Sequence, residues 1–162
     1  MKGEFIMIFN IENARKIDEG ETYKNKFLII NEKYFSEHHK NAKNQLCFAV
    51  GGFGCDPKKI RVEIFANIYD ENIRVLRNDI LGIATEETIK AWEKEYNLSR
   101  NCLLPKENQE LIKVIETYKE EGYDETDIID MCFEKEYTLE DFEIIGSGVW
   151  AKQVAEEHGL LP

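Results

Sequence analysis

Residues 62–77 read Val-Glu-Ile-Phe-Ala-Asn-Ile-Tyr-Asp-Glu-Asn-Ile-Arg-Val-Leu-Arg, and this stretch indicates the type of fold. Apolar residues at 62, 64, 66 and 68 alternate with the residues between them, which is the period of a β-strand with two different faces. Asp70-Glu71-Asn72 then forms a short polar connection to a second strand-like run at residues 73–77. The stretch therefore predicts a β-hairpin.

Three short apolar runs of strand length precede this hairpin, at residues 5–9, 26–31 and 46–50. Residues 34–39 have the composition of one short helical turn between two of them. Short strands at close spacing favour a small antiparallel sheet. Residues 1–84 are thus predicted to form about five strands in a strongly bent or partly barrel-like sheet, with a glycine-rich bend.

After Thr85 the period changes to that of helices. Thr85 followed by two glutamates is typical of a helix N-cap, and Gly122 is typical of a helix end. The pattern Thr138-Leu139-Glu140-Asp141 resembles a capping box. The fold class is therefore α+β: a β-rich half, residues 1–84, followed by an acidic helical half, residues 85–162, in one compact unit. Helices are expected from residues 85 to about 98, 105 to 122, 124 to 133, from 138, and from 149 to 158.

The chain has a net charge of −11, and its whole acidic excess lies in the second half. Residues 1–84 hold 13 Lys/Arg against 12 Asp/Glu, whereas residues 85–162 hold 8 against 20. Between residues 116 and 143, 12 acids face only Lys119 and Lys135. An acidic surface repels nucleic-acid phosphates and attracts basic surfaces. The alternative interpretation is a solvated face that keeps the protein soluble.

The first interpretation predicts binding to the basic surface of a nucleic-acid-binding host protein, with no direct contact to nucleic acid and no membrane. Rows of acids at helical spacing would supply the contacts. The candidate partner-binding residues are Glu116, Glu120, Glu121, Asp124, Glu125, Asp127, Asp130 and Glu134.

The composition also indicates what class of protein this is. No run of about 18 apolar residues occurs, and the first residues lack the pattern of a signal peptide, so a soluble cytoplasmic protein is expected. Tyr137, Phe142 and Trp150 stand near acids and could anchor an interface, although a role in the core of the helical half is favoured. No catalytic signature is present, and the chain is not expected to be an enzyme or to need a cofactor.

The glycine-rich stretch Gly51–Pro57 carries the competing interpretation. Its glycines permit close backbone approach, as in a phosphate loop, but no Lys-Ser/Thr pair follows, so a bend between strands is favoured. A metal or enzymatic site centred on Gly51–Asp56 is the alternative. His38, His39, Cys47 and Cys55 are its possible ligands, yet their spacing matches no zinc motif. Cys102 and Cys132 are expected to be packed thiols. A Cys-His nucleophile using His38, His39 or His158 has no supporting signature.

The segments Asn44–Pro57, Val62–Phe65 and Arg77–Ala84 resemble small accessory proteins encoded on phages, plasmids and conjugative elements of AT-rich Gram-positive bacteria. The resemblance covers residues 23–84 and carries no catalytic residues. Where the pattern has a glycine after Lys59-Ile60, this chain has Arg61. The resemblance implies a mobile-element setting, in which acidic anti-CRISPR and antirestriction proteins occupy nucleic-acid channels. The expected function is an anti-defence inhibitor, with a regulatory partner of the element's own machinery as an alternative.

Overall fold

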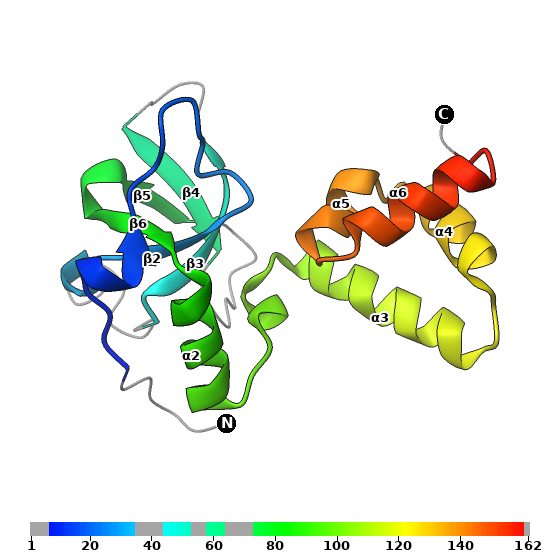
Figure 1. Cartoon of the computed structure of the whole chain (residues 1–162), viewed down its shortest axis with the longest axis horizontal. Helices are drawn as coiled ribbons and strands as arrows, with labels where there is room; N and C mark the ends of the chain where they lie inside the picture. Colours follow the sequence, from blue (N-terminus) through cyan, green and yellow to red (C-terminus); the bar gives the residue numbers. More distant parts are fainter. Residues whose placement is uncertain (1–6, 35–43, 53–57, 64–72, 161–162) are drawn as a thin grey trace. The chain divides into compact units, whose positions relative to one another are not determined.

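The computed structural model describes residues 7–34, 44–52, 58–63 and 73–160 (Figure 1). The chain folds as two compact units, residues 1–104 and 105–162. The first unit contains an antiparallel sheet with the strand order β1-β6-β2-β3-β4-β5. The strands are β1 (Ala14–Arg15), β2 (Phe27–Ile30), β3 (Leu46–Gly52), β4 (Lys59–Glu63), β5 (Ile73–Leu76) and β6 (Ile80–Ala84).

The α+β class is confirmed, with one difference in the sheet. The described residues form six strands, and the sheet is open because β1 and β5 are its two edges rather than partners of each other. β4 and β5 pair from Lys59 with Leu76 to Val62 with Ile73, so the two hairpin strands are present where the structure describes them. Their connection lies in residues 64–72, outside the described part. Most of the predicted helical turn at residues 34–39 also lies outside it.

The predicted strand at residues 5–9 is wrong for its described part, Met7–Phe9, which has no strand pairing. The side chain of Gln45 takes the place of a neighbouring strand. Its Oε1 accepts from the Phe9 backbone N–H at 2.7 Å, and its Nε2 donates to the carbonyls of Phe9 and Ile30 at 3.0 and 2.9 Å. The strand beside β2 is β6, whose apolar run 80–84 the hairpin pattern did not include.

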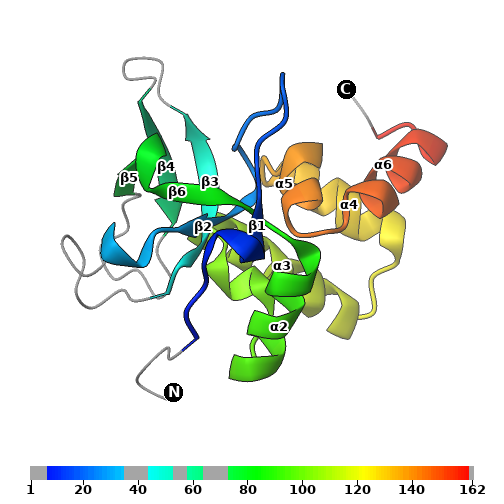
Figure 2. The ribbon, with the colours of Figure 1, turned by 60° about the vertical axis from the view of Figure 1, so that its left-hand side comes forward.

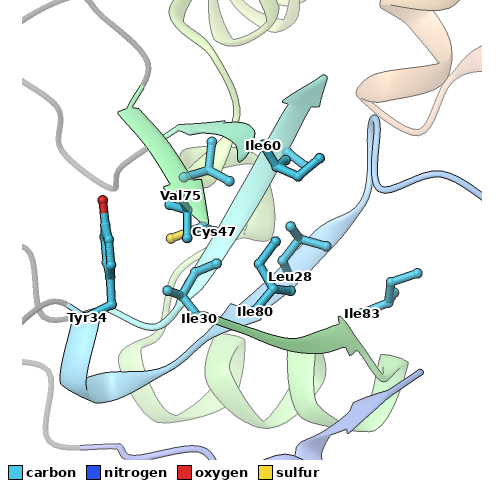
Figure 3. Close-up of a cluster of buried hydrophobic side chains, with 10 residues drawn as sticks. Leu28, Ile30, Tyr34, Cys47, Ile60, Val75, Ile80 and Ile83 are labelled. Carbon is cyan, nitrogen blue, oxygen red and sulfur yellow. The ribbon is translucent and has the colours of Figure 1, made fainter. Parts of the chain in front are cut away.

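One face of the sheet carries a cluster of buried apolar side chains (Figure 3). Figure 3 shows Val75, Cys47 and Ile30 close together in this cluster, with Tyr34 at its margin. The Tyr34 hydroxyl donates to the carbonyl of Arg74 at 3.2 Å, so the one polar atom of this aromatic side chain is paired. Alternation along the strands places these residues on one side because neighbouring side chains point to opposite faces.

The opposite face is covered in part by α2 (Glu86–Tyr96), which follows β6 directly (Figure 2). Ile89 and Trp92 of α2 form a buried cluster with Ile29 and Leu46 of the sheet. Trp92 is fully buried, and its indole N–H donates to Asn44 Oδ1 at 3.0 Å. Because this helix completes the core of the sheet, the first unit ends at residue 104 instead of at the expected boundary near Thr85.

The last regular element of the first unit is the 3-10 turn η3 (Arg100–Leu103). The other two 3-10 turns of the described residues precede β1 and β6. Arg100 at the start of η3 holds this turn to α2, since its guanidinium donates to Glu86 and Glu93 at 2.6–3.0 Å. Paired with two carboxylates, the Arg100 guanidinium lowers the pKa of Glu86 and of Glu93. The short elements are η1 (Ile11–Asn13), η2 (Arg77–Asp79) and η3 (Arg100–Leu103).

In the described part of the second unit, residues 105–160, the regular elements are all helices. Its core contains the fully buried Phe142, with the rings of Phe133 and Trp150 packed edge-on against it at 6.1 and 6.3 Å. α3 contacts α4 and α5, and α6 contacts the same two helices. The capping box at Thr138 is confirmed, and the helix that it opens ends after one and a half turns. The helices are α3 (Lys106–Glu120), α4 (Glu125–Glu134), α5 (Leu139–Ile144) and α6 (Gly148–Glu157).

Among the described residues, the helices are too short and too polar for any of them to cross a lipid bilayer.

Candidate functional site

The acidic character of the chain belongs to the helical unit. Residues 105–162 hold 5 Lys/Arg against 16 Asp/Glu, a net charge of −11, whereas residues 1–104 hold 16 of each. The eight predicted partner-binding carboxylates all lie in this unit, and every one of them is exposed. We call this set the acidic surface: Glu116, Glu120, Glu121, Asp124, Glu125, Asp127, Asp130 and Glu134.

The centre of the acidic surface is the turn between α3 and α4. Gly122 has a φ of +88°, a left-handed conformation that glycine adopts at little cost. Its N–H donates to the carbonyl of Lys119, and the N–H of Tyr123 donates to the carbonyl of Tyr118, both at 3.1 Å. This pair of bonds is a Schellman motif, and the rings of Tyr118 and Tyr123 complete it with an edge-on contact at 5.8 Å. The prediction that Gly122 ends a helix is confirmed.

Asp124 begins the next helix immediately after this turn. Its carboxylate accepts from the N–H of Asp127 at 2.9 Å, which makes it the N-cap of α4. With one helix ending at Gly122 and the next beginning at Asp124, the backbone between Glu121 and Asp127 is fixed by hydrogen bonds. Four of the eight carboxylates lie in these seven residues.

The remaining carboxylates extend from the turn along both helices. Glu116 and Glu120 are one turn apart on α3, and Asp130 and Glu134 follow Asp127 on α4 at spacings of three and four residues. Such spacings place side chains on the same side of a helix. The structure therefore gathers Glu120, Glu121 and the start of α4 at one end of the α3–α4 pair and continues the acidic row along α4.

None of the eight carboxylates forms an ion pair with a lysine or arginine within the described ranges. The lysine nearest in sequence, Lys119, lies over the ring of Trp150 at 5.6 Å instead. On α6, Lys152 reaches Glu156 at 4.0 Å, in the same unit but outside the acidic surface. The carboxylates are thus available to cations from outside the protein.

The helix dipoles divide the acidic surface into two groups. A carboxylate at a helix N-terminus is stabilised by the positive end of the dipole, whereas one at the C-terminus faces the negative end. Glu125 and Asp127 lie in the first turn of α4 and stabilise it. Glu120 and Glu121 lie at the last residue and the C-cap of α3, where they oppose it. Helix stability therefore accounts for Glu125 and Asp127 but not for Glu120 and Glu121.

This division gives a first prediction, with opposite signs on the two sides of the turn. The double variant Glu120→Gln/Glu121→Gln should unfold at a higher urea concentration than the original chain. Its free energy of unfolding at low salt should rise by about 0.3–1 kcal/mol per replaced residue. The double variant Glu125→Gln/Asp127→Asn has the same net charge and should lose a similar amount. Both differences should shrink at high salt because ions screen exposed charges. If the two variants changed the free energy of unfolding equally and with the same sign, net charge alone would determine the effect.

One possible ligand of the alternative metal site, Cys47, lies in the hydrophobic core. Cys47 on β3 is fully buried, and burial raises the pKa of its thiol to about 12. Its Sγ lies 3.6 Å from the carbonyl oxygen of Asn44. His38, His39 and Cys55 fall outside the described residues, as does the loop 53–56. Within the residues that are described, no cluster of three or more His, Cys, Asp or Glu could hold a metal ion.

The two other thiols that the structure describes, Cys102 and Cys132, are not activated as nucleophiles. Burial raises the pKa of Cys102 and of Cys132 to about 11, so both are protonated at neutral pH. His158, the one histidine in the described ranges, is exposed at the end of α6. The prediction of packed thiols, made for Cys102 and Cys132, is confirmed for Cys132, which is buried, whereas Cys102 is only partly buried.

Tyr123 belongs to the candidate site, although it is not among the residues that the sequence pattern predicted. Its side chain is 45% exposed in the middle of the acidic surface, where the Tyr118 ring holds it in place. The available signal was its position directly after a helix-ending glycine, where an apolar residue commonly packs back on the helix. Tyr137, Phe142 and Trp150, by contrast, belong to or pack against the core of the helical unit, as the sequence favoured.

The fold and the site define an α+β protein with an electrically neutral sheet unit and a strongly acidic helical unit. Comparisons with protein-family models, with curated proteins and with solved structures found no match to this chain.

Proposed function

We propose that this chain is a non-enzymatic binding protein whose acidic surface occupies a basic groove of a host protein that binds nucleic acid. The observation that carries this proposal is the set of eight exposed carboxylates around the turn between α3 and α4, which backbone hydrogen bonds hold in place. In the described structure none of the eight forms an ion pair with a lysine or arginine. The setting that we propose is a mobile genetic element, in which the protein acts as an anti-defence inhibitor of the anti-CRISPR type.

The chemistry of recognition is competition for the same cations. A groove that binds nucleic acid carries lysine and arginine side chains placed for phosphates, and a carboxylate can accept the same hydrogen bonds from an arginine fork. The net charge of −11 on the helical unit would also steer the approach to a basic groove and speed association. Tyr123 adds a half-exposed aromatic ring to the centre of the surface, and such rings are common anchors of interfaces.

The test is a charge reversal that spares the helix cap. The variant Glu120→Lys/Glu121→Lys/Glu125→Lys/Asp130→Lys keeps Asp124, whose loss would weaken α4 and confuse the result. Binding to a purified, guide-free RNA-guided nuclease from a Gram-positive host is measured by surface plasmon resonance, together with inhibition of its DNA cleavage. We expect the affinity to fall at least tenfold, mainly in low salt, because several close charge pairs become repulsive.

The control variant reverses four exposed acids of the sheet unit, Glu12, Glu19, Glu32 and Glu95, and so changes the net charge equally. It should bind the nuclease nearly as tightly as the original chain. Equal losses in the two variants would show that only net charge matters. An affinity that does not change when the acidic surface is reversed would refute the proposal.

A further inference from the structure

A cation lies on an aromatic ring of the helical unit, beside the acidic row of α3. The ring belongs to Trp150, the third residue of α6, which is partly buried and packs against the fully buried Phe142. Nζ of Lys119, near the end of α3, lies 5.6 Å from the centroid of this ring. The face of an aromatic ring is negative and attracts a cation at such a distance. Trp150 therefore holds a positive charge in the folded unit.

Lys119 takes this position although carboxylates are close to it in the sequence. Glu116 precedes it by three residues, a spacing at which opposite charges on a helix commonly pair, and Glu120 follows it directly. Within residues 105–160, which the structure describes without a gap, Lys119 forms no ion pair. The ring thus holds the ammonium in preference to an exposed carboxylate. It is a cation site that the chain's own lysine fills.

An arginine side chain suits this site better than a lysine does. A guanidinium is planar, stacks on aromatic faces and is hydrated less strongly than an ammonium. Its N–H groups lie in the plane of the group, so they stay free for carboxylates while the face rests on the ring. Lys119 is exposed and has a flexible side chain, so it can leave the ring without a change in the backbone. Its ammonium then has Glu116 one helical turn away as a partner.

From this geometry we propose that the ring of Trp150 binds an arginine side chain of the partner, and that Lys119 occupies the ring until this arginine displaces it. This role rests on the proposed function, because the carboxylates on either side of Lys119 attract the basic partner. The partner is then expected to present an arginine, not a lysine, to this ring. Lys119 competes with that arginine and so lowers the affinity of the chain for its partner.

The test compares fluorescein-labelled hexa-arginine and hexa-lysine peptides. Binding to the full chain is measured by fluorescence anisotropy at about 50 mM salt, where exposed charges are only weakly screened. The two peptides carry the same charge, so net charge alone would attract them equally. We expect the original chain to bind hexa-arginine more tightly by about two- to fivefold, the factor that one exposed cation–π contact supplies.

Two variants of Lys119 test the displacement in opposite directions. Lys119→Gln frees the ring and should bind hexa-arginine about two- to fivefold more tightly than Lys113→Gln, which removes the same charge from an exposed position of the same helix. Lys119→Arg keeps the charge but holds the ring more firmly. It should therefore bind hexa-arginine about twofold more weakly than Lys113→Arg does.

Removing the ring should abolish this difference. In a chain with Trp150→Leu, Lys119→Gln should bind hexa-arginine no more tightly than Lys113→Gln does. Circular dichroism shows whether Trp150→Leu keeps its helices, because Trp150 packs on Phe142. If this variant unfolds, the variants of Lys119 and Lys113 decide the question, since both lysines are exposed.

Two results would overturn this role of Trp150 and Lys119, and they differ in what they leave standing. Equal affinities of Lys119→Gln and Lys113→Gln for hexa-arginine would exclude the ring as a binding element but leave the acidic surface as a site for basic partners. Binding of neither peptide by the original chain would contradict the proposed function as well.

Discussion

Replacing Gly82 by alanine should destabilise the sheet unit by about 3 kcal/mol or more. Gly82 lies in β6 with a φ of +152°, a backbone conformation that residues with a β-carbon rarely adopt. A β-carbon at this position would overlap the backbone carbonyl oxygen of Arg15 in the neighbouring strand β1. Since backbone atoms cannot rotate away as a side chain can, β1 would have to separate from β6.

A second glycine separates the two causes of this effect. Gly20 also has a left-handed φ, +80°, but a β-carbon there would meet no atom within 4 Å. Gly20→Ala should therefore cost only the conformational part, about 1–2 kcal/mol. Urea unfolding followed by tryptophan fluorescence measures both, because Trp92 is buried in the sheet unit. Equal costs for the two variants would show that β1 is not held against Gly82.

Replacing Phe142 by alanine should cost about 3–5 kcal/mol. The ring is fully buried between Phe133 and Trp150, and its removal leaves a cavity in the core of a small unit. A core of that size rarely supplies more than about 3–5 kcal/mol. The helical unit should therefore be largely unfolded at room temperature while the sheet unit stays folded.

The measurement is thermal unfolding by circular dichroism, in which the helical signal should fall at low temperature before the sheet unit unfolds. Val149→Ala is the control because Val149 belongs to the same unit and is 85% exposed, so its replacement should change little. If Phe142→Ala kept its full helical signal, the packing described for α4, α5 and α6 would be incorrect. If both units unfolded together, their stabilities would be coupled.

The elements with strong local signals were predictable from the sequence. Helix starts at Thr85, Asp124 and Thr138 were recognised because a side-chain oxygen there accepts from a nearby backbone N–H, which depends on a few neighbouring residues. The helix end at Gly122 follows from the same kind of local chemistry. The apolar run at residues 27–30 was recognised as a strand, since its length and composition favour one.

Long-range pairing was less predictable. The run at residues 5–9 has the composition of a strand, but its described part, Met7–Phe9, is held by the Gln45 side chain and by the Tyr96 hydroxyl, which accepts from the Met7 N–H at 2.7 Å. The place beside β2 belongs to β6, which contains Gly82. No local pattern shows which of two apolar runs will pair with β2, because the choice depends on contacts between residues far apart in the chain.

For the candidate site, the sequence by itself determined the chemistry: eight carboxylates within nineteen residues and too few lysines to neutralise them. The tertiary structure decided their arrangement. The Schellman motif at Gly122 and the cap at Asp124 fix the turn, and packing on the Phe142 core leaves the acids on the outside. Net charge follows from composition alone. Which side of each helix faces water depends on how its apolar side packs in the folded chain, and so only the folded chain has a defined acidic surface.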